Sequence, residues 1–181
     1  MKIDLALMPF ELEKKDLRGK AVAVVDALRA TSTMVAAFEN GCSAFIPVST
    51  VEEAMQLAAL KKDPDLLLGG ERKAMPLEGF HLGNSPRDYR PEKVRGKVVV
   101  LTTTNGTQAL LAARKAAEVF IGAFLNISAL SRRLEETGRD VIIVCSGEKG
   151  LFCLEDTVCA GAISDRLEQE GVSVSMSDAA V

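Results

Sequence analysis

The sequence predicts an α/β fold, a three-layer α/β/α arrangement built on a mostly parallel or mixed sheet. Short apolar runs rich in β-branched residues, typical of buried strands, recur along the 181 residues. Helix-compatible stretches with capping signals lie between them. Strands that alternate with helices favour a parallel sheet covered on both faces. No repeat or linker interrupts the chain, so we expect a single α/β domain over residues 1–181, with the strands near 21–25, 97–102 and 141–145 in its parallel core.

The composition narrows the classes of function and the place of action. With 48% hydrophobic and 26% charged residues, the chain resembles a globular protein. A net charge of −3 and 4% aromatic residues argue against a nucleic-acid partner. No membrane-spanning run or signal-peptide core is evident, so we expect a cytoplasmic protein without a membrane partner. Four cysteines without a CxxC pair and one histidine argue against zinc.

The first half of the chain is expected to alternate strands, helices and one long loop. Residues 1–9 alternate loosely, as an edge strand would, and 11–20 are a charged connection. The next strands are expected at 21–25, 44–48 and 66–68. The helices are expected at 34–39, ended by Asn40 and Gly41, and at 51–61, where Ser49 with Glu52 or Thr50 with Glu53 has capping-box spacing. Residues 69–91 contain four glycines and three prolines, and a loop of this length is usually functional.

The second half repeats the alternation around the apolar run at 98–101. That run is the expected central strand, and an alanine- and leucine-rich helix follows it. The remaining strands are expected at 118–123, 140–145 and 172–174, and the helices at 126–137 and 154–170. Residues 177–181 resemble the cap and first turn of a helix that does not follow. We therefore expect the chain to be truncated at its C-terminus relative to a longer parent.

The turn after the central strand is a candidate anion site. The first N–H groups of a helix and its dipole favour a phosphate or sulfonate. Hydroxyl and amide side chains add hydrogen-bond donors. The turn consists of Thr103, Thr104, Asn105, Gly106 and Thr107. The alternative is an ordinary strand-to-helix turn in which Thr104 or Asn105 is the N-cap.

Acidic and basic side chains also follow other strands, where ligands bind in open α/β sheets. Asp26 and Arg29 follow the strand at 21–25, and Glu71, Arg72 and Lys73 follow the strand at 66–68. The last long strand is followed by Cys145, Ser146, Glu148, Lys149, Glu155 and Asp156. Carboxylates beside anion donors indicate Mg²⁺, which takes one or two carboxylates, keeps waters and bridges to a phosphate. That combination is typical of metal-assisted phosphoryl transfer.

Several ordered blocks of the sequence resemble the 2-phosphosulfolactate phosphatases. The blocks are VDALRATST at 25–33, GER at 70–72, GFHLGNSP at 79–86, TTTNGT at 102–107, and CSG at 145–147 continued by FCLED at 152–156. The resemblance implies an α/β, Mg²⁺-dependent phosphohydrolase. Its substrate would be a small anionic phosphoester, 2-phospho-3-sulfolactate, which yields 3-sulfolactate and phosphate in a step of coenzyme M biosynthesis. Members of the family are longer than this chain.

Roles are assigned to the residues of these blocks by their chemistry. The catalytic candidates are Asp26, Glu71, Glu155 and Cys145, and the metal candidates are Asp26, Glu155 and Asp156. The substrate-binding candidates are Arg29, Arg72, Asn84, Ser85, Thr103, Thr104, Asn105, Gly106 and Thr107. Either arginine offers a bidentate fork to phosphate or sulfonate.

Three alternatives remain open from the sequence. His81 is either a proton-transfer group or an ordinary loop histidine. Cys145 is a candidate low-pKa thiol, although the CX5R cradle of cysteine phosphatases is absent, because Leu151 stands where its arginine would be. The chain as a whole is alternatively a non-catalytic module that binds a small anion or phosphometabolite, or a structural subunit of a homo-oligomer. A module would need the anion turn but not the carboxylates, and no Walker or GxGxxG pattern supports nucleotide binding.

Overall fold

The computed structural model describes residues 1–169 and 175–180. The strands are β1 (Lys2–Ala6), β2 (Ala21–Val25), β3 (Ala44–Pro47), β4 (Leu66–Arg72), β5 (Met75–Pro76), β6 (Val98–Thr102), β7 (Glu118–Gly122), β8 (Val141–Cys145) and β9 (Ser175–Met176). The α-helices are α1 (Ala30–Glu39), α2 (Val51–Lys61), α3 (Pro91–Val94), α4 (Gly106–Ala112), α5 (Ile127–Glu136) and α6 (Leu154–Gln169). The 3₁₀ turns are η1 (Pro9–Lys14), η2 (Pro86–Asp88) and η3 (Ala113–Lys115).

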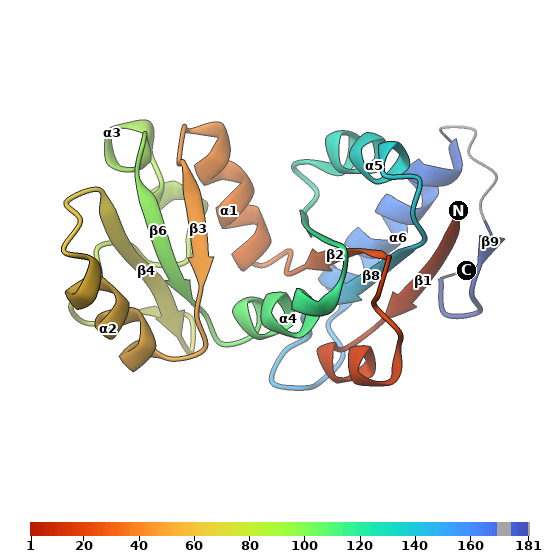
Figure 1. Cartoon of the computed structure of the whole chain (residues 1–181), viewed down its shortest axis with the longest axis horizontal. Helices are drawn as coiled ribbons and strands as arrows, with labels where there is room; N and C mark the ends of the chain where they lie inside the picture. The colour runs from red at the N-terminus through yellow and green to blue at the C-terminus, as the bar shows by residue number, and fades with distance from the viewer. Residues whose placement is uncertain (170–174, 181) are drawn as a thin grey trace.

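The described strands form two sheets that lie in two lobes (Figure 1). One sheet has the order β7-β2-β8-β1-β9 and the other the order β3-β6-β4-β5. Every pairing within the sheets is parallel except the antiparallel pair of β4 and β5. The predicted α/β class with a mixed sheet is thereby confirmed.

The first sheet is covered on both faces. Ala21, Ala23 and Val25 of β2 pack in one apolar cluster with α5 and α6, whereas Val22 and Val24 pack in another with η1 and α4. All five residues of β2 are buried, which explains why this strand is a continuous apolar run instead of an alternating one. The layers are therefore helix, sheet and helix, as the sequence predicts.

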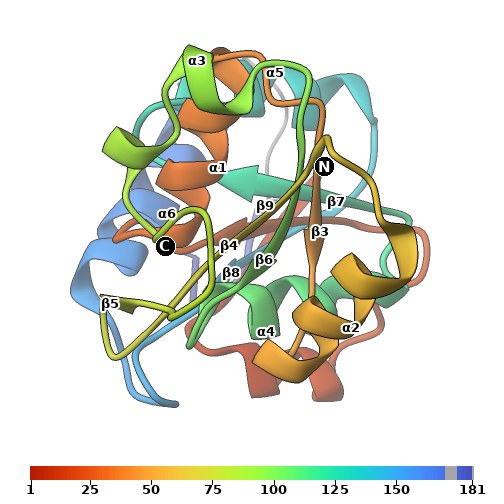
Figure 2. The same ribbon diagram turned by 90° about the vertical axis from the view of Figure 1, so that its left-hand side faces the viewer.

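The second sheet has the same layering. Val99 and Leu101 of β6 pack with α1 and with Tyr89 and Val94 beyond η2, and Val100 packs with α2 on the other face. Figure 2, which looks onto this lobe, shows α1 and α3 on one side of the strands and α2 on the other. The expectation that 97–102 would share a parallel core with 21–25 and 141–145 is wrong, because β6 is an inner strand of this second sheet. Apolar composition predicts that a strand is buried but does not select its partners.

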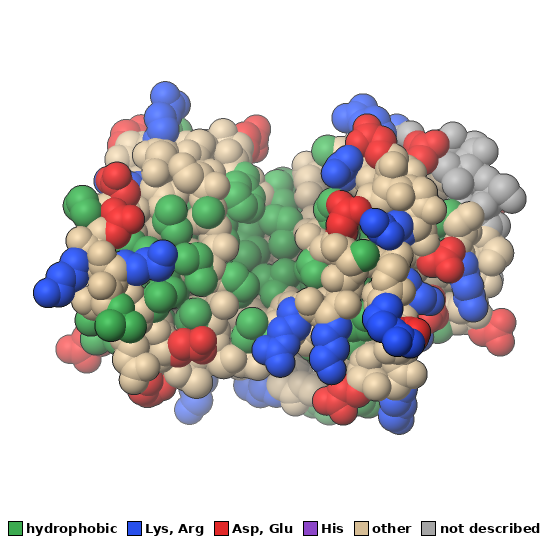
Figure 3. Space-filling view, in the orientation of Figure 1, with side chains coloured by type: hydrophobic (Ala, Val, Ile, Leu, Met, Phe, Trp, Pro, Cys, Tyr) green, Lys and Arg blue, Asp and Glu red, His purple; other side chains and the backbone are tan. Residues whose placement is uncertain are grey.

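The chain passes between the lobes at two described loops, β2 to α1 and β6 to α4. Each loop leaves the carboxyl end of a strand in one sheet and enters a helix that packs on the other. Figure 3 shows apolar side chains in the narrow region between the lobes. The elements α1 and β7 contact one another there and carry the exposed Phe38 and Val119. The crossing loops, in contrast, lie at the carboxyl ends of the strands and contribute to the candidate site.

Several element boundaries differ from the expectations. β1 is not an edge strand, because β9 pairs with its outer side. α1 begins at Ala30 instead of 34, since Asp26 Oδ1 accepts the Ala30 N–H at 2.9 Å and stabilises an earlier first turn. The long loop of 69–91 contains the β4–β5 hairpin. Thr50 caps α2 as expected, accepting the Glu53 N–H at 3.1 Å, and the strand expected at 172–174 lies outside the described residues.

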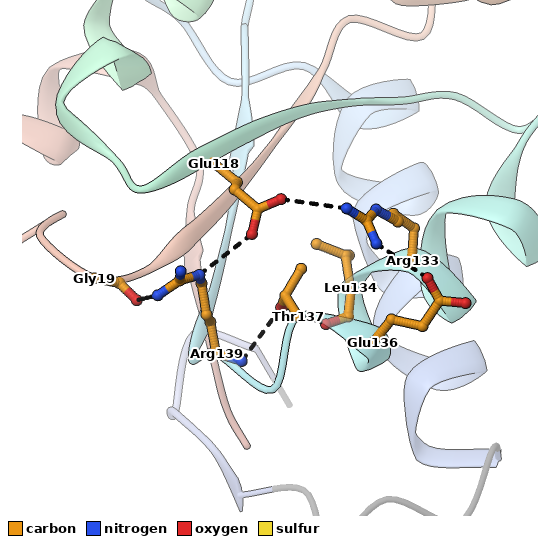
Figure 4. Close-up of polar contacts among 7 residues, drawn as sticks. All are labelled: Gly19, Glu118, Arg133, Leu134, Glu136, Thr137 and Arg139. Carbon is orange, nitrogen blue, oxygen red and sulfur yellow. Dashed lines mark hydrogen bonds and ion pairs between the residues drawn. The ribbon is translucent and has the colours of Figure 1, made fainter.

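Ion pairs between side chains lie at the amino-terminal edge of the first sheet (Figure 4). Glu118 at the start of β7 pairs with Arg133 of α5 at 3.6 Å and with Arg139 at 3.3 Å. These side chains are partly exposed, so each pair contributes little to stability. None of the described helices combines the length and apolar character needed to cross a membrane.

Candidate functional site

The carboxyl ends of four strands, two from each sheet, meet at a cavity of about 330 Å³. β2 and β8 approach it from the first lobe, and β4 and β6 approach it from the second. The residues that line the cavity are Asp26, Leu28, Arg29, Glu71, Lys73, Ala74, Asn84, Thr104, Asn105, Gly147, Glu148, Lys149, Cys153, Glu155 and Asp156. The structure thus brings together most of the residues selected from the sequence, although they are spread over about 130 positions.

Asp26 is a buried carboxylate in the wall of the cavity. It follows β2, is 8% exposed, and accepts the N–H of Ala30. Its pKa is raised from 3.8 to about 6, chiefly by burial; the negative charges of Asp156 and Glu71 add to the rise, and the hydrogen bond from Ala30 opposes it. A carboxyl with this pKa is poised either to exchange a proton near neutral pH or to bind a cation.

Asp156 is a second buried carboxylate, 3% exposed, in the first turn of α6. Its Oδ1 accepts the N–H of Ala27 at 2.8 Å and its Oδ2 accepts the N–H of Gly147 at 3.1 Å. Burial raises the pKa of Asp156, although these hydrogen bonds oppose the shift. Because Ala27 follows β2 and Gly147 follows β8, Asp156 connects the ends of two neighbouring strands.

These carboxylates fit a hard divalent cation. Within the described residues, neither Asp26 nor Asp156 forms an ion pair with Lys, Arg or His. Two buried charges without a counter-ion are costly, and oxygen ligands are those that Mg²⁺ prefers. The described part of the chain has no group of three or more His, Cys, Asp and Glu side chains placed for one metal. Water and substrate oxygens would therefore complete the coordination, as is usual for Mg²⁺.

Glu155, the third predicted metal ligand, also lines the cavity and is half-buried. A hydrogen bond with the thiol of Cys153 lowers the pKa of Glu155, and the same interaction adds to the burial that raises the pKa of Cys153 to about 12. Glu155 is therefore ionised at neutral pH beside the two buried aspartates. Its predicted roles as ligand and as acid/base group remain predictions.

Glu71 lies in the same cavity, but both of its oxygens are engaged by the backbone. Oε1 accepts the N–H of Thr104 at 2.8 Å, and Oε2 accepts the N–H of Ala74 at 2.7 Å. The side chain thereby holds the β4–β5 hairpin against the β6–α4 turn. Its catalytic role remains a prediction, and the contacts favour a positioning role.

The threonine turn uses much of its hydrogen-bonding capacity internally. Thr107 N donates to Thr103 Oγ1 at 3.1 Å, and Thr103 N donates to Thr107 Oγ1 at 3.1 Å. The N–H of Thr104 is taken by Glu71, and Asn105 Oδ1 accepts the N–H of Lys149 at 3.0 Å. Three of the amides expected to bind an anion therefore bond within the protein. Asn105 is the N-cap residue of α4 but makes no side-chain cap hydrogen bond.

Two other predicted substrate-binding residues face the cavity. Arg29 lies at the N-cap of α1 and lines the cavity. Asn84 is 8% exposed, and its Oδ1 has no hydrogen-bond partner among the described residues; the same holds for Thr104 Oγ1. Buried polar atoms are almost always hydrogen-bonded, so unpaired atoms in the wall of a cavity indicate that a polar ligand binds there.

The structure places seven candidates outside the cavity lining: Thr103, Gly106 and Thr107 of the threonine turn, and four others. Arg72 donates through Nη2 to Thr102 Oγ1 at 2.8 Å, turning its guanidinium toward the protein. Cys145 is fully buried, and burial raises its pKa to about 12, so a thiolate is disfavoured. His81 Nδ1 accepts the N–H of Leu68 at 2.9 Å, as an ordinary loop histidine would. Ser85 is half-buried before η2.

Sequence reasoning did not select two cations that line the cavity, Lys73 and Lys149. Both follow strands in the sequence, but no feature of the sequence distinguishes them from solvated lysines. The available signal was weak. Lys149 precedes Gly150 in a turn-like dipeptide, and Lys73 lies between the end of one apolar run and a proline-containing loop.

Comparison with known proteins gives a consistent result. A family model described as "2-phosphosulpholactate phosphatase" matches residues 6–181. A "Probable 2-phosphosulfolactate phosphatase" of Caldanaerobacter subterraneus subsp. tengcongensis is 46% identical over 157 residues, covering 87% of this chain and 65% of that protein. Proteins with the same description from Clostridium novyi (43% identity, 91% and 70% coverage) and Clostridium beijerinckii (38%, 99% and 76%) are also similar. The chain thus spans about two thirds to three quarters of the length of these relatives.

Proposed function

This chain belongs to the 2-phosphosulpholactate phosphatase family, a family of phosphoric monoester hydrolases, and from that premise we propose that it hydrolyses 2-phospho-3-sulfolactate to 3-sulfolactate and phosphate with Mg²⁺. The reaction would belong to coenzyme M biosynthesis in the cytoplasm. The observation that carries the proposal is the pair of buried carboxylates, Asp26 and Asp156, which lack a counter-ion in the described residues and face a cavity that Arg29 also lines.

Asp26 and Asp156 would hold the Mg²⁺. The charge of Asp156 lies close enough to raise the pKa of Asp26, and a divalent cation would remove that repulsion. When bound, the ion would neutralise charge on the phosphate oxygens, which is the main contribution of metals to phosphoryl transfer. Asp156 is already fixed by the amides of Ala27 and Gly147, so its carboxylate is preorganised for a ligand.

The other cavity residues divide the remaining tasks. Arg29 binds the phosphate through its planar fork of N–H donors. Glu155, ionised and half-buried, accepts the proton of the attacking water. The water oxygen bonds to phosphorus, the bond from phosphorus to the lactate C2 oxygen breaks, and a proton from the water returns to that oxygen. The overall reaction needs no reactant besides water.

A non-catalytic anion-binding module explains the cavity less well. Such a module gains affinity from cations and N–H donors, and a buried carboxylate beside the anion would oppose binding. The cavity contains Asp26 and Asp156 at its buried side, and the nearby turn has used three amides internally. This distribution supports a site that binds a cation together with the anion.

The proposal is tested by measuring phosphate release from 2-phospho-3-sulfolactate with purified protein. We expect turnover with Mg²⁺, reversible loss in chelator, and loss in Asp156→Asn. Asp165→Asn is the matched control, because it makes the same change at an exposed position of the same helix. Unchanged turnover in chelator would contradict the metal role, and no release from any small phosphoester with Mg²⁺ would contradict the activity.

A further inference from the structure

Lys73 and Lys149 occupy equivalent places in two separate hairpins. Arg72 pairs with Met75 around the two-residue loop of Lys73 and Ala74, whose φ angles are 53° and 62°. The second loop, Lys149 and Gly150, has φ angles of 51° and 76° and lies between Glu148 and Leu151. Positive φ at both loop residues is typical of a type I′ turn. Each lysine is therefore the first residue of a tight left-handed turn.

The two hairpins belong to different lobes but are held by adjacent residues of one turn. Thr104 donates its N–H to Glu71, whose other oxygen accepts the N–H of Ala74 in the first loop. Asn105 accepts the N–H of Lys149 itself through Oδ1. The β6–α4 turn thereby fixes the backbone of both lysine-bearing loops at the cavity.

Lysine is a poor choice for these positions on conformational grounds. Asn, Asp and Gly are the residues that a type I′ turn favours, because a larger side chain with positive φ is sterically strained. The third described lysine with positive φ, Lys62, ends α2 and lies outside the cavity lining. Strained residues that cluster at a cavity often have a functional role, and both remaining lysines line the same cavity.

The charges of these lysines are available to a ligand. Within the described residues Lys73 has no ion pair, and Lys149 has only a contact of 3.7 Å with Glu148, in which both side chains are about two thirds exposed. Such an exposed pair contributes little energy. An anionic substrate entering a cavity that also contains Asp26, Glu155 and Asp156 needs cations to offset their repulsion.

We propose that Lys73 and Lys149 form a two-sided cationic clamp that selects phosphoesters with a sulfonate as a further anionic group, one lysine binding the phosphate and the other the sulfonate. The inference rests on the proposed function for the identity of the substrate but not for the existence of the clamp. Glu71 and Asn105 act as positioning residues in this arrangement. Because the two hairpins come from different lobes, binding to the clamp depends on the distance between the two anions as well as on their charge.

The test compares Lys73→Gly, Lys149→Gly and the matched control Lys62→Gly. All three changes replace a lysine with positive φ by the residue that favours this conformation, so the melting temperature should rise or stay unchanged in each. Calorimetric titration of the metal-free protein with 2-phospho-3-sulfolactate should give a dissociation constant about ten- to a hundredfold higher for the first two variants. Lys62→Gly should bind as the original protein does.

A second ligand, 2-phospholactate, separates the roles of the two lysines because it lacks the sulfonate. One of the two cavity variants should lose much less affinity for this ligand than for the sulfonated one. Lys73→Met and Lys149→Met repeat the measurement without adding backbone freedom, and they should show the same losses.

The clamp is overturned if both cavity variants bind 2-phospho-3-sulfolactate as tightly as Lys62→Gly, or if both lose equally on the two ligands. Binding without hydrolysis by the original protein when Mg²⁺ is present would contradict the proposed function while leaving the clamp intact. Hydrolysis with unchanged binding in the variants would do the reverse. Absence of any binding by the original protein, both with and without Mg²⁺, would overturn both.

Discussion

Gly106 lies directly against the carboxylate of Asp26. A Cβ added at Gly106 would stand 2.6 Å from Asp26 Oδ2 and 2.5 Å from the Cβ of Ala30. The two loops that cross between the lobes therefore touch at this point. Gly106 contributes only backbone atoms to the contact, whereas the other loop contributes the side chains of Asp26 and Ala30. The close approach of α4 to the buried acid depends on the absence of a side chain at 106.

Gly106→Ala is expected to damage both stability and the site. Overpacking a contact of this kind costs about 1–3 kcal/mol, and the shift needed to relieve it would displace Asp26. The control is Gly161→Ala within α6, where nothing lies within 4 Å of the added Cβ, so stability should rise by about 0.5–1 kcal/mol. Denaturant unfolding measures both changes, and equal effects of the two substitutions would contradict the contact.

Arg29→Ala should chiefly lower activity and Arg72→Ala should chiefly lower stability, although the sequence predicts both as substrate-binding residues. Arg29 lines the cavity, so its loss should lower kcat/KM about ten- to a hundredfold with little effect on stability. Arg72 donates to Thr102 Oγ1 and to the carbonyl of Glu71, so its loss should chiefly lower the free energy of unfolding, by about 1–3 kcal/mol. Kinetics and thermal unfolding of both variants, measured side by side, test the distinction.

Asp26→Asn should stabilise the metal-free protein above pH 6. The pKa of Asp26 is raised from 3.8 to about 6 in the folded state, so its contribution favours folding below pH 3.8 and is lost as the pH rises through 6. The amide removes this loss, about 3 kcal/mol at most, and its oxygen can still accept the Ala30 N–H. Melting temperatures in chelator at pH 4 and pH 8 should show the gain only at pH 8.

Magnesium should make the original protein more stable than the Asp26→Asn variant, which is the reverse of the order expected in chelator at pH 8. If Asp26 holds the ion, Mg²⁺ raises the melting temperature of the original protein, because a ligand that binds only the folded state stabilises it. The Asp26→Asn variant should show a much smaller rise, whereas Asp165→Asn should behave as the original protein does. An equal rise in all three proteins would remove Asp26 from the metal site.

Asp4 provides a stability test far from the cavity. Burial alone would raise its pKa, but hydrogen bonds from Lys15 at 2.6 Å and Ser177 at 2.8 Å outweigh it and lower the pKa below 3.8. Its contribution is therefore present above pH 3.8 and is lost as the pH falls through the lower folded value. Asp4→Asn should cost about 0.5–1.5 kcal/mol at pH 7.

The same substitution should cost almost nothing once the pH is below the lowered folded pKa of Asp4, where its carboxyl is protonated in both states. Asp165→Asn serves as the control, because its exposed carboxylate has no ion pair in the described residues. Urea unfolding at both pH values gives the comparison. A cost for Asp4→Asn that does not change with pH would exclude the ion pair as its cause.

The sequence by itself determined the elements and the edge at which the site lies. Local periodicity and capping depend on neighbouring residues, so β2, β6 and β8 and the helices α2 and α5 were predicted close to their observed bounds. Polar residues after parallel strands meet at one edge for a general geometric reason. Asp26 and Asp156 were found in this way, 130 positions apart, in one cavity.

Tertiary structure alone decided which sheet each strand joins and which neighbouring side chain faces the ligand. β6 became an inner strand of a second sheet, since pairing depends on contacts distant in the sequence. Glu71 and Arg72 are adjacent at the end of β4, where successive side chains point to opposite faces, and only Glu71 lines the cavity. Lys73 and Lys149 line the cavity because hydrogen bonds hold two left-handed turns from different lobes at Thr104 and Asn105. No local sequence pattern encodes this arrangement.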